Sequence, residues 1–163
     1  MCKVKPIKAS EIFPVIEEIL EHGGRAWITV TGMSMYPFLR DGLDCVELSA
    51  CSFDTAKKGD IVLIQRKTGE YVLHRILCKK KSVFYIIGDA QQWIEGPLEK
   101  EQLIAVVSAI RRGKRTISCS NFIWKLLSFL WLGVIPIRYK LLKGIRLASQ
   151  MLHIGKTLKD IRR

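Results

Sequence analysis

The chain has 163 residues and a formal net charge of +12. This length allows one domain with a sizeable core and a shorter appendage. The charge is concentrated in residues 121–163, which contain 9 of the 27 lysines and arginines and a single acidic residue. Basic charge attracts nucleic acid or anionic lipid, and the hydrophobicity of this tail favours lipid. The sequence contains no repeat, no low-complexity tract and no phosphate-binding glycine loop.

The cysteine pattern argues against a zinc site. The five cysteines are odd in number and irregularly spaced, without a CxxC pair, and the three histidines are scattered. We therefore expect reduced, partly buried thiols in a protein that faces the cytosol, with no metal and no other cofactor. Residues 1–6 carry charges without an apolar run behind them, so no secretory signal is expected. The cysteines are Cys2, Cys45, Cys51, Cys78 and Cys119.

Residues 10–22 predict an amphipathic helix that packs on the rest of the domain. Glu11 suits its first turn, and Gly23 with Gly24 ends it. Pro14 favours a start near Phe13, because proline is best tolerated in the first turn. The apolar residues recur at helical spacing on one face. They are Ile12, Phe13, Ile16, Ile19 and Leu20.

Short strands are predicted after this helix, separated by turn signals rich in glycine and charged residues. Two of them, 61–65 and 71–78, flank a five-residue turn and indicate a hairpin. Since no long helix interrupts the strands, the sequence favours a mainly β domain over residues 1–120, an antiparallel barrel or sandwich. The predicted strands are 26–30, 44–48, 61–65, 71–78, 82–87 and 103–110.

Residues 121–163 differ in character from the β domain. Residues 122–137 are apolar except for Lys125 and Ser128, but 16 residues are fewer than the ~20 that a membrane-crossing helix needs. Pro136 ends or kinks this segment. A basic amphipathic helix is predicted after it, which together with Trp124 and Trp131 favours binding at a membrane interface. The alternatives are a helical hairpin packed on the domain, a dimer interface, or a helix that binds nucleic acid. The stripe of that last helix is Leu141, Ile145, Ala148 and Leu152, with Lys140, Lys143, Arg146, Lys156, Lys159, Arg162 and Arg163 around it.

The chemistry of the chain centres on Ser34, which lies between two methionines directly after a predicted strand. A serine hydroxyl is a poor nucleophile unless a base takes its proton. His74 is the candidate base, on the apolar face of strand 71–78, where a partly desolvated imidazole stays neutral at pH 7. The alternative interpretation is that His74 is a structural core residue whose ring nitrogens are hydrogen-bonded within the protein. Asp89 and Glu95, in the loop 88–97, both qualify to orient the ring. The alternative, non-catalytic interpretations are that Asp89 is a turn residue and that Glu95 is a solvent-exposed charge in the loop.

Five short motifs in order give a more specific expectation. They are Gly32-Met33-Ser34-Met35-Tyr36-Pro37, Asp41-Gly42, Lys58-Gly59-Asp60-Ile61-Val62, Leu73-His74-Arg75-Ile76 and Ile87-Gly88-Asp89-Ala90. Over residues 29–107 the chain resembles the type I signal peptidase superfamily, which also contains the self-cleaving repressors of the DNA-damage response. The histidine followed by arginine resembles the Ser-His branch of the endoplasmic reticulum and archaea rather than the Ser-Lys branch of bacteria.

The resemblance implies roles for individual residues. Ser34 would be the nucleophile and His74 the general base, with the third member at the place held here by Glu95, while Asp89 matches its own motif. Met33 and Met35 would line the substrate groove, and the Ser34 N–H would help to form an oxyanion hole. Gly32 stands where some relatives carry a hydroxyl. Substrates would bind as an added strand.

The resemblance also has departures. An N-terminal transmembrane helix, usual in membrane-bound relatives, is not apparent, and 28 residues before the core are too few for the DNA-binding domain of the repressors. We therefore expect a membrane-associated serine endopeptidase that cleaves leader or signal segments, either in protein export or in processing of a peptide made inside the cell. The alternative is an inactive module on the same fold that binds a membrane or a partner. The hypothesis that the chain binds nucleic acid rests on net charge alone, so we expect no nucleic-acid partner.

Overall fold

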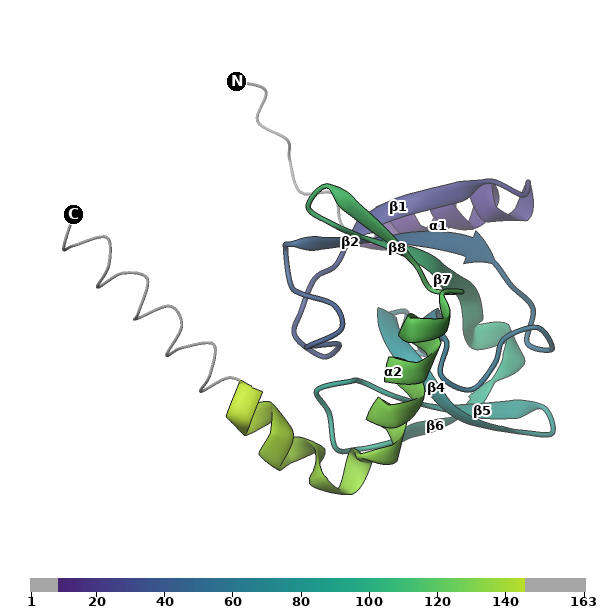
Figure 1. The fold of residues 1–163 in the computed structure, drawn as a ribbon. Helices are drawn as coiled ribbons and strands as arrows, with labels where there is room; N and C mark the ends of the chain where they lie inside the picture. Colours follow the sequence, from purple (N-terminus) through teal and green to yellow (C-terminus); the bar gives the residue numbers. More distant parts are fainter. Residues whose placement is uncertain (1–8, 146–163) are drawn as a thin grey trace, which may run out of the picture.

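The computed structural model describes residues 9–145, which form a mainly β fold with helices at both ends (Figure 1). All strand pairings are antiparallel, in the order β1-β2-β7-β3-β4-β5-β6, with β8 paired to β7. The elements are α1 (Ala9–Glu21), β1 (Arg25–Thr29), β2 (Asp44–Ala50), β3 (Ile61–Gln65), β4 (Tyr71–Lys80), β5 (Val83–Ile87), β6 (Glu95–Glu99), a 3₁₀ turn (Lys100–Gln102), β7 (Leu103–Arg112), β8 (Arg115–Ser118), α2 (Phe122–Gly133), a second 3₁₀ turn (Ile135–Ile137) and a helical segment over 138–145.

The antiparallel sheet predicted from the sequence is confirmed, but it is not closed into a barrel. β1 and β6 end the strand order, and each pairs with a neighbour on one side only. The sheet curls instead, so that β1, β2 and β8 lie above β4, β5 and β6 in Figure 1. β6 contains Gly96 and Pro97, which are typical of edge strands. Proline lacks the backbone N–H that pairing with a further strand would need. The curl leaves open strand edges next to the serine loop.

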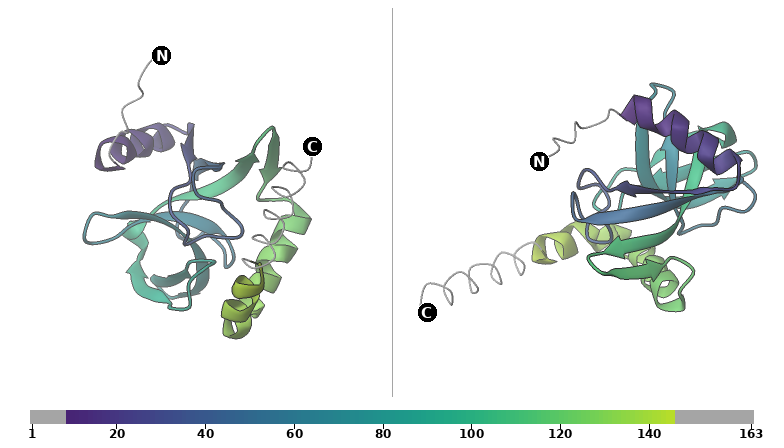
Figure 2. Two further views of the ribbon diagram at one scale, coloured as in Figure 1. Left: turned by 90° about the vertical axis from the view of Figure 1, so that its left-hand side faces the viewer. Right: turned by 90° about the horizontal axis from the view of Figure 1, so that it is seen from above.

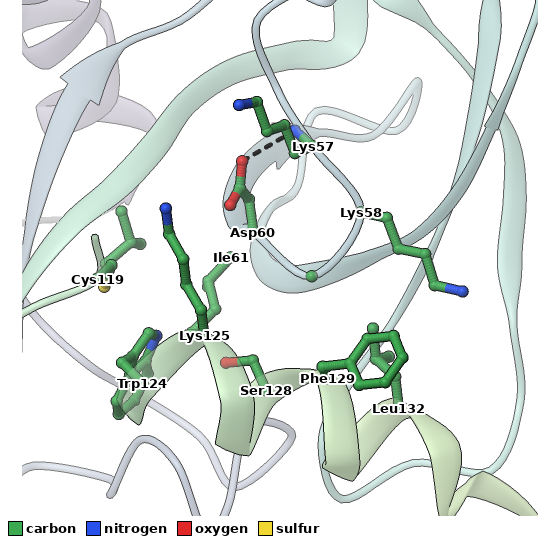
Figure 3. Close-up of a pocket in the computed structure, with 12 residues that line it drawn as sticks. Lys57, Lys58, Asp60, Ile61, Cys119, Trp124, Lys125, Ser128, Phe129 and Leu132 are labelled. Atoms are coloured by element: carbon green, nitrogen blue, oxygen red, sulfur yellow. Dashed lines mark hydrogen bonds between the residues drawn. The ribbon is translucent and has the colours of Figure 1, made fainter. Parts of the chain in front are cut away.

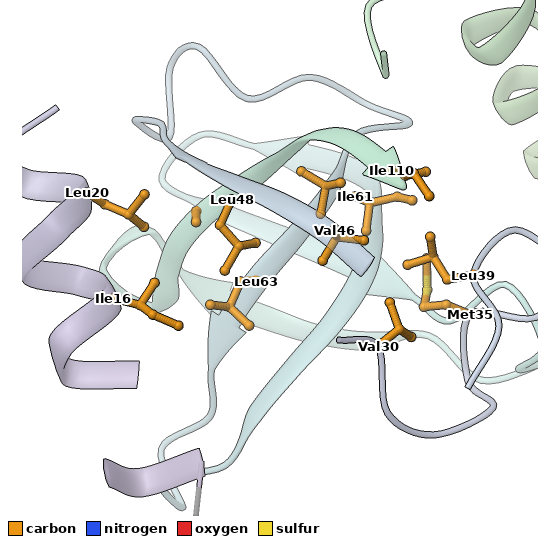
Figure 4. Packing of buried hydrophobic residues seen from close by; sticks show 12 residues of the cluster. Ile16, Leu20, Val30, Met35, Leu39, Val46, Leu48, Ile61, Leu63 and Ile110 are labelled. Carbon is orange, nitrogen blue, oxygen red and sulfur yellow. The ribbon is translucent and has the colours of Figure 1, made fainter. Parts of the chain in front are cut away.

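The core is split into two clusters by the central strand β3. Ile61 and Leu63 belong to the cluster under α1, β1 and β2, which Figure 4 shows. Val62 and Ile64 face a second cluster with Phe84. A strand that is buried on both faces needs a continuous apolar run, as β3 has, rather than alternation. Each such side chain stabilises the fold by about 1.5–3 kcal/mol. β3 therefore fixes its neighbour β4, which carries His74.

Differences from the predicted elements have local causes. The six predicted strands are present, with ends shifted by at most two residues. α1 begins at Ala9 rather than near Phe13, because Ile16 and Leu20 anchor the helix and Pro14 removes only one backbone donor. β6 and β8 were missed: β6 reads Glu-Gly-Pro-Leu-Glu, which lacks a strand pattern, and pairs with β5. β8 completes a hairpin with β7 around Gly113, whose φ is +59°.

The tail packs on the β domain through α2 and the segment 138–145. Figure 2 shows both helical segments against one side of the molecule. Trp124 packs against the first core cluster, and Ser128 and Leu132 are buried. Within residues 9–145 no single helix has the length and hydropathy to cross a membrane, whereas α2 and Ile135–Ile145, bent by 66°, qualify as a pair on length and composition alone. The predicted positions Arg146, Ala148, Leu152, Lys156, Lys159, Arg162 and Arg163 lie outside the described residues.

Candidate active site

The loop that carries Ser34 is closed at its base by backbone hydrogen bonds. The Val30 N–H donates to the Asp44 carbonyl, and the Gly42 N–H donates to the Val30 carbonyl, both at 2.9 Å. Within the loop, the Gly32 N–H donates to Asp41 Oδ1 at 2.9 Å. Gly32 has φ +85°, a region where a side chain is strained, so its backbone geometry explains the glycine. Asp41 and Gly32 together fix the turn before the serine.

A buried carboxylate anchors the end of the same loop. Asp44 accepts hydrogen bonds from Arg40 Nη2 and Arg112 Nη2, each at 2.8 Å. Burial raises the pKa of Asp44, but hydrogen bonds from these two guanidinium groups outweigh it and hold the pKa at about 2. This anchor is not visible in the sequence, because Arg112 lies 68 residues away and is brought near by the pairing of β2 with β7.

Ser34 borders a cleft of about 570 Å³ between α1, β1 and the start of β4. β1 has no strand on its outer side, and β4 pairs with β5 only from Arg75 onward. Two strand edges with unused backbone groups therefore flank the cleft, which is a geometry that accepts an extended peptide. The lining is mainly apolar: Ile12, Phe13, Trp27, Ile28, Thr29, Val30, Thr31, Gly32, Ser34, Met35, Leu63, Tyr71, Val72 and Leu73.

The two methionines beside Ser34 have different surroundings. Met35 is 2 % exposed and belongs both to the core and to the cleft wall. Met33 is 48 % exposed and is not among the described residues that line the cleft. Of the pair predicted to line the groove, the structure therefore brings Met35 to it together with Gly32 and leaves Met33 on the surface.

His74 follows the cleft residues Val72 and Leu73 on β4 and is 2 % exposed. Its buried Nδ1 has no hydrogen-bond partner among the described residues and lies 3.7 Å from Glu95 Oε2. Burial lowers the pKa of His74, and the nearby Glu95 only partly offsets this. The ring is therefore neutral at pH 7, which a general base requires. Between described residues, the Ser34 hydroxyl and the His74 ring make no hydrogen bond.

Glu95 lies on the edge strand β6, and the predicted loop 88–97 is wrong over its last three residues. Arg66 donates to both of its oxygens, Nε to Oε1 at 2.6 Å and Nη2 to Oε2 at 2.7 Å. These hydrogen bonds lower the pKa of Glu95, so its carboxylate is ionised at neutral pH. Glu95 is therefore not the freely solvated loop charge that the sequence also allowed. Glu95 faces His74 Nδ1 as a charged, oriented carboxylate.

Asp89 is engaged elsewhere. Arg75 donates to both of its oxygens, Nε to Oδ1 at 2.9 Å and Nη2 to Oδ2 at 2.7 Å, and both side chains are fully buried. Arg75 also donates to the Gly59 carbonyl at 2.7 Å and stacks on Phe38. With both oxygens occupied, Asp89 serves as an internal anchor. Of the two predicted carboxylates, it is Glu95 that the fold brings to the histidine.

The loop after β5 connects this anchor to the serine. The Ala90 N–H donates to the Ser34 carbonyl at 2.7 Å. A Cβ on Gly88 would lie 2.8 Å from the same carbonyl oxygen, so this position has room for glycine only. Arg75, next to His74 in sequence, holds Asp89 between these two contacts. The serine loop and the histidine strand are thereby fixed to one framework.

Two tail residues complete the framework, in roles that the sequence does not reveal: Trp131 was predicted to favour a membrane interface, and Arg138 was predicted only as part of the basic tail. The Trp131 indole N–H donates to the Asp89 carbonyl at 3.1 Å. Arg138 is fully buried and donates to the carbonyls of Gly88 and Trp131, each at 3.1 Å. In the sequence, Arg138 reads as one more basic residue of a charged tail. Its burial depends on the 66° bend after α2, for which Pro136 was the visible signal.

Neither a scan against models of known protein families nor a search of curated proteins gave a match to this chain. Function is therefore inferred from the motifs and from the geometry of the cleft. The four described cysteines are free thiols and partly buried, and none borders the Ser34 cleft.

Proposed function

We propose that the chain is a serine endopeptidase of the signal-peptidase type that cleaves leader or signal segments near a membrane. The observation that carries the proposal is the cleft between two open strand edges, with Ser34 on its wall and a buried, neutral His74 facing an ionised Glu95 at 3.7 Å. The curled antiparallel sheet, with the serine loop after β1 and the histidine on β4, supports a signal-peptidase-like fold.

The reaction would proceed by acyl transfer. The Ser34 Oγ attacks the scissile carbonyl while His74 takes the hydroxyl proton through Nε2. The Ser34 N–H, which has no hydrogen-bond acceptor among the described residues, stabilises the negative oxygen that forms. The proton then passes to the leaving amine, and an acyl-enzyme remains. A water that gives its proton to His74 hydrolyses this ester and restores the Ser34 hydroxyl.

Glu95 would act on the opposite side of the ring. A carboxylate near Nδ1 favours the tautomer with the proton on Nδ1, which leaves the Nε2 lone pair for the serine. The reaction would require the 3.7 Å separation to shorten to a hydrogen bond and the serine hydroxyl to reach Nε2 when substrate fills the cleft. Arg66 keeps Glu95 charged during this step.

Substrate recognition would rest on backbone pairing. An extended peptide adds as a strand to the edge of β1 or to residues 71–74 of β4. Apolar walls from α1 and β1 accept apolar side chains on alternate residues, because successive side chains of a strand point to opposite faces. This pattern suits the hydrophobic segment of a leader or signal peptide.

The tail would hold the enzyme at the membrane. α2 exposes a broad apolar surface, and the neighbouring Lys140 and Lys143 supply positive charge for anionic lipid. This surface is the α2 apolar face, made of Phe122, Ile123, Leu126, Leu127, Phe129 and Leu130. Replacing Phe122 and Leu127 with serine should lower co-sedimentation with anionic vesicles at least tenfold, whereas unchanged co-sedimentation would contradict a membrane role of this face.

The second candidate function is a binding module without turnover. Two observations favour it: Arg66 already occupies both oxygens of Glu95, and Ser34 and His74 make no hydrogen bond to each other in the described part of the chain. Such a module would bind extended apolar peptides in the same cleft and release them intact.

A peptide-library digestion separates the two functions. The purified protein is incubated with a library of apolar leader-like peptides in the presence of anionic vesicles, and new termini are identified by mass spectrometry. Cleavage by wild type and by Ser82→Ala, a surface serine control, but not by Ser34→Ala, supports the endopeptidase. Binding of peptides without cleavage supports the module, and cleavage by Ser34→Ala assigns the activity to another protein.

A further inference from the structure

A second cavity of about 420 Å³ lies between α2 and the turn that precedes β3 (Figure 3). It shares no lining residue with the Ser34 cleft. Its volume falls in the ~300–1,000 Å³ range of small-molecule sites. Its walls combine aromatic and aliphatic side chains, among them Trp124, Phe129 and Leu132, with the three lysines Lys57, Lys58 and Lys125.

The charge of this pocket is unbalanced. None of its three lysines forms an ion pair with a carboxylate in residues 9–145. Asp60 is the one acidic residue of the lining, and its Oδ2 accepts the Lys57 backbone N–H at 2.8 Å, the dashed contact in Figure 3. The pocket therefore presents excess positive charge to a ligand, which favours an anionic group.

An orphaned hydroxyl lies at the base of the same pocket. Ser128 is 4 % exposed, and its oxygen is buried without a hydrogen-bond partner among the described residues. Buried hydroxyls are normally satisfied, so an unpaired one calls for a missing partner. Figure 3 shows the Ser128 hydroxyl directed into the pocket beneath Lys125. An anionic oxygen at this point would accept from Ser128, and the long side chain of Lys125, which starts beside Ser128 on the same helix, would supply the positive charge.

The apolar wall sets the rest of the ligand. Trp124, Phe129 and Leu132 lie along one side of α2 and line the pocket next to Ser128. Phe129 is also part of the α2 apolar face, so the pocket opens beside that face. We propose that this pocket binds a single-chain fatty-acid carboxylate, with the carboxylate on Ser128 and Lys125 and the acyl chain along Trp124, Phe129 and Leu132. The site is independent of the peptidase activity proposed for Ser34.

Calorimetric titration of the full-length protein with sodium decanoate tests the site. Decanol supplies the same chain without charge, and acetate supplies the carboxylate without the chain. We expect saturable binding of decanoate at one site and at least tenfold weaker binding of decanol and acetate. Ser128→Ala and Lys125→Met should each weaken decanoate binding about tenfold, since each removes a hydrogen bond to a charged group. Lys114→Met, an exposed lysine outside the pocket and outside the tail, should leave it unchanged.

Folding is controlled separately, because Ser128→Ala removes an unsatisfied hydroxyl and should not lower the thermal midpoint. Unsaturable decanoate binding, equal binding of decanol, or unchanged affinity in both pocket variants would overturn the proposal. Vesicles of phosphatidylglycerol form a further arm. If the variants lose vesicle binding while decanoate does not bind, the pocket takes a bilayer headgroup instead of a single-chain ligand, which also overturns it. Acylation of Ser34 in these variants reports on the peptidase proposal alone.

Discussion

Two arginine–carboxylate pairs flank His74 and differ in burial rather than in bonding. Arg75 and Asp89 are both fully buried, whereas the side chains of Arg66 and Glu95 are 32 % and 21 % exposed. In each pair the guanidinium donates to both carboxylate oxygens. Burial makes the first pair a fixed part of the framework, because neither charge can be left alone in the interior. Partial exposure leaves the second pair able to respond to the protonation of His74.

Asp89→Ala should have the largest effect on stability. It leaves the Arg75 charge buried without its partner, and we expect a loss of about 3–5 kcal/mol in the free energy of unfolding. Urea denaturation measures this loss. Glu95→Ala is the matched comparison and should cost no more than about 1 kcal/mol, because water can solvate Arg66. Equal losses of unfolding free energy in the two variants would contradict the distinction between the buried Arg75–Asp89 pair and the partly exposed Arg66–Glu95 pair.

Glu95→Gln should affect chemistry rather than folding. Loss of the carboxylate removes the group that favours the productive tautomer of His74, so acylation of Ser34 should slow by about 100-fold at pH 7. It also removes a charge that raises the pKa of His74, so the acid limb of the acylation rate should move to lower pH. Stopped-flow acylation between pH 4 and pH 8 measures both effects. If neither the acylation rate nor the acid limb of its pH profile changes, Glu95 has a structural role only.

Arg138→Met tests whether the tail belongs to the framework. The variant leaves the Gly88 and Trp131 carbonyls without this donor and should cost about 1–3 kcal/mol. Lys140→Met, exposed two residues further along, should change stability by less than about 0.5 kcal/mol. Denaturation of the two variants side by side gives the comparison, and equal stability would mean that the tail docks without supporting the loop.

The pH dependence of stability gives the smallest effect. The folded-state pKa of His74 lies below its ordinary value of 6.5, so the unfolded chain binds the proton more readily. The contribution of neutral His74 to the free energy of unfolding is therefore fully present above about pH 6.5. It is lost as the pH drops toward the folded pKa, by at most about 1.4 kcal/mol per pH unit. His74→Gln should remove this component from a pH series of denaturation curves. An identical slope in wild type and variant would contradict a neutral, buried His74.

Strand and helix positions were predictable wherever local pattern and tertiary packing agree. The β-branched run of β3 and the hairpin to β4 needed no long-range information. β6 was not predictable, because Glu95-Gly96-Pro97 lacks a strand pattern and depends on pairing with β5. The sequence left a barrel and a sandwich open, and the sheet is not closed into a barrel, because strand propensity does not determine whether the two edges meet.

The site was predictable in its residue types but not in its pairings. The motif around Ser34 and the strand with His74 lie within single segments, so sequence alone pointed to them. The choice between Asp89 and Glu95 depended on which arginine reaches which carboxylate, and both arginines lie more than ten residues away. Burial of Arg138 depends on a bend and a loop from another region, which no local charge pattern reveals.

The acylation rate of Ser34 tests the central claim most directly. The protein is treated with a serine-directed acylating probe, the label is located by mass spectrometry, and the rate constant is compared across wild type, Ser34→Ala, His74→Ala and the surface control Ser82→Ala. The predicted result is a single label on Ser34 in wild type and control, none in Ser34→Ala, and at least a 100-fold slower reaction in His74→Ala. Labelling at the same rate with His74→Ala, or none with wild type, would contradict a Ser34–His74 catalytic pair.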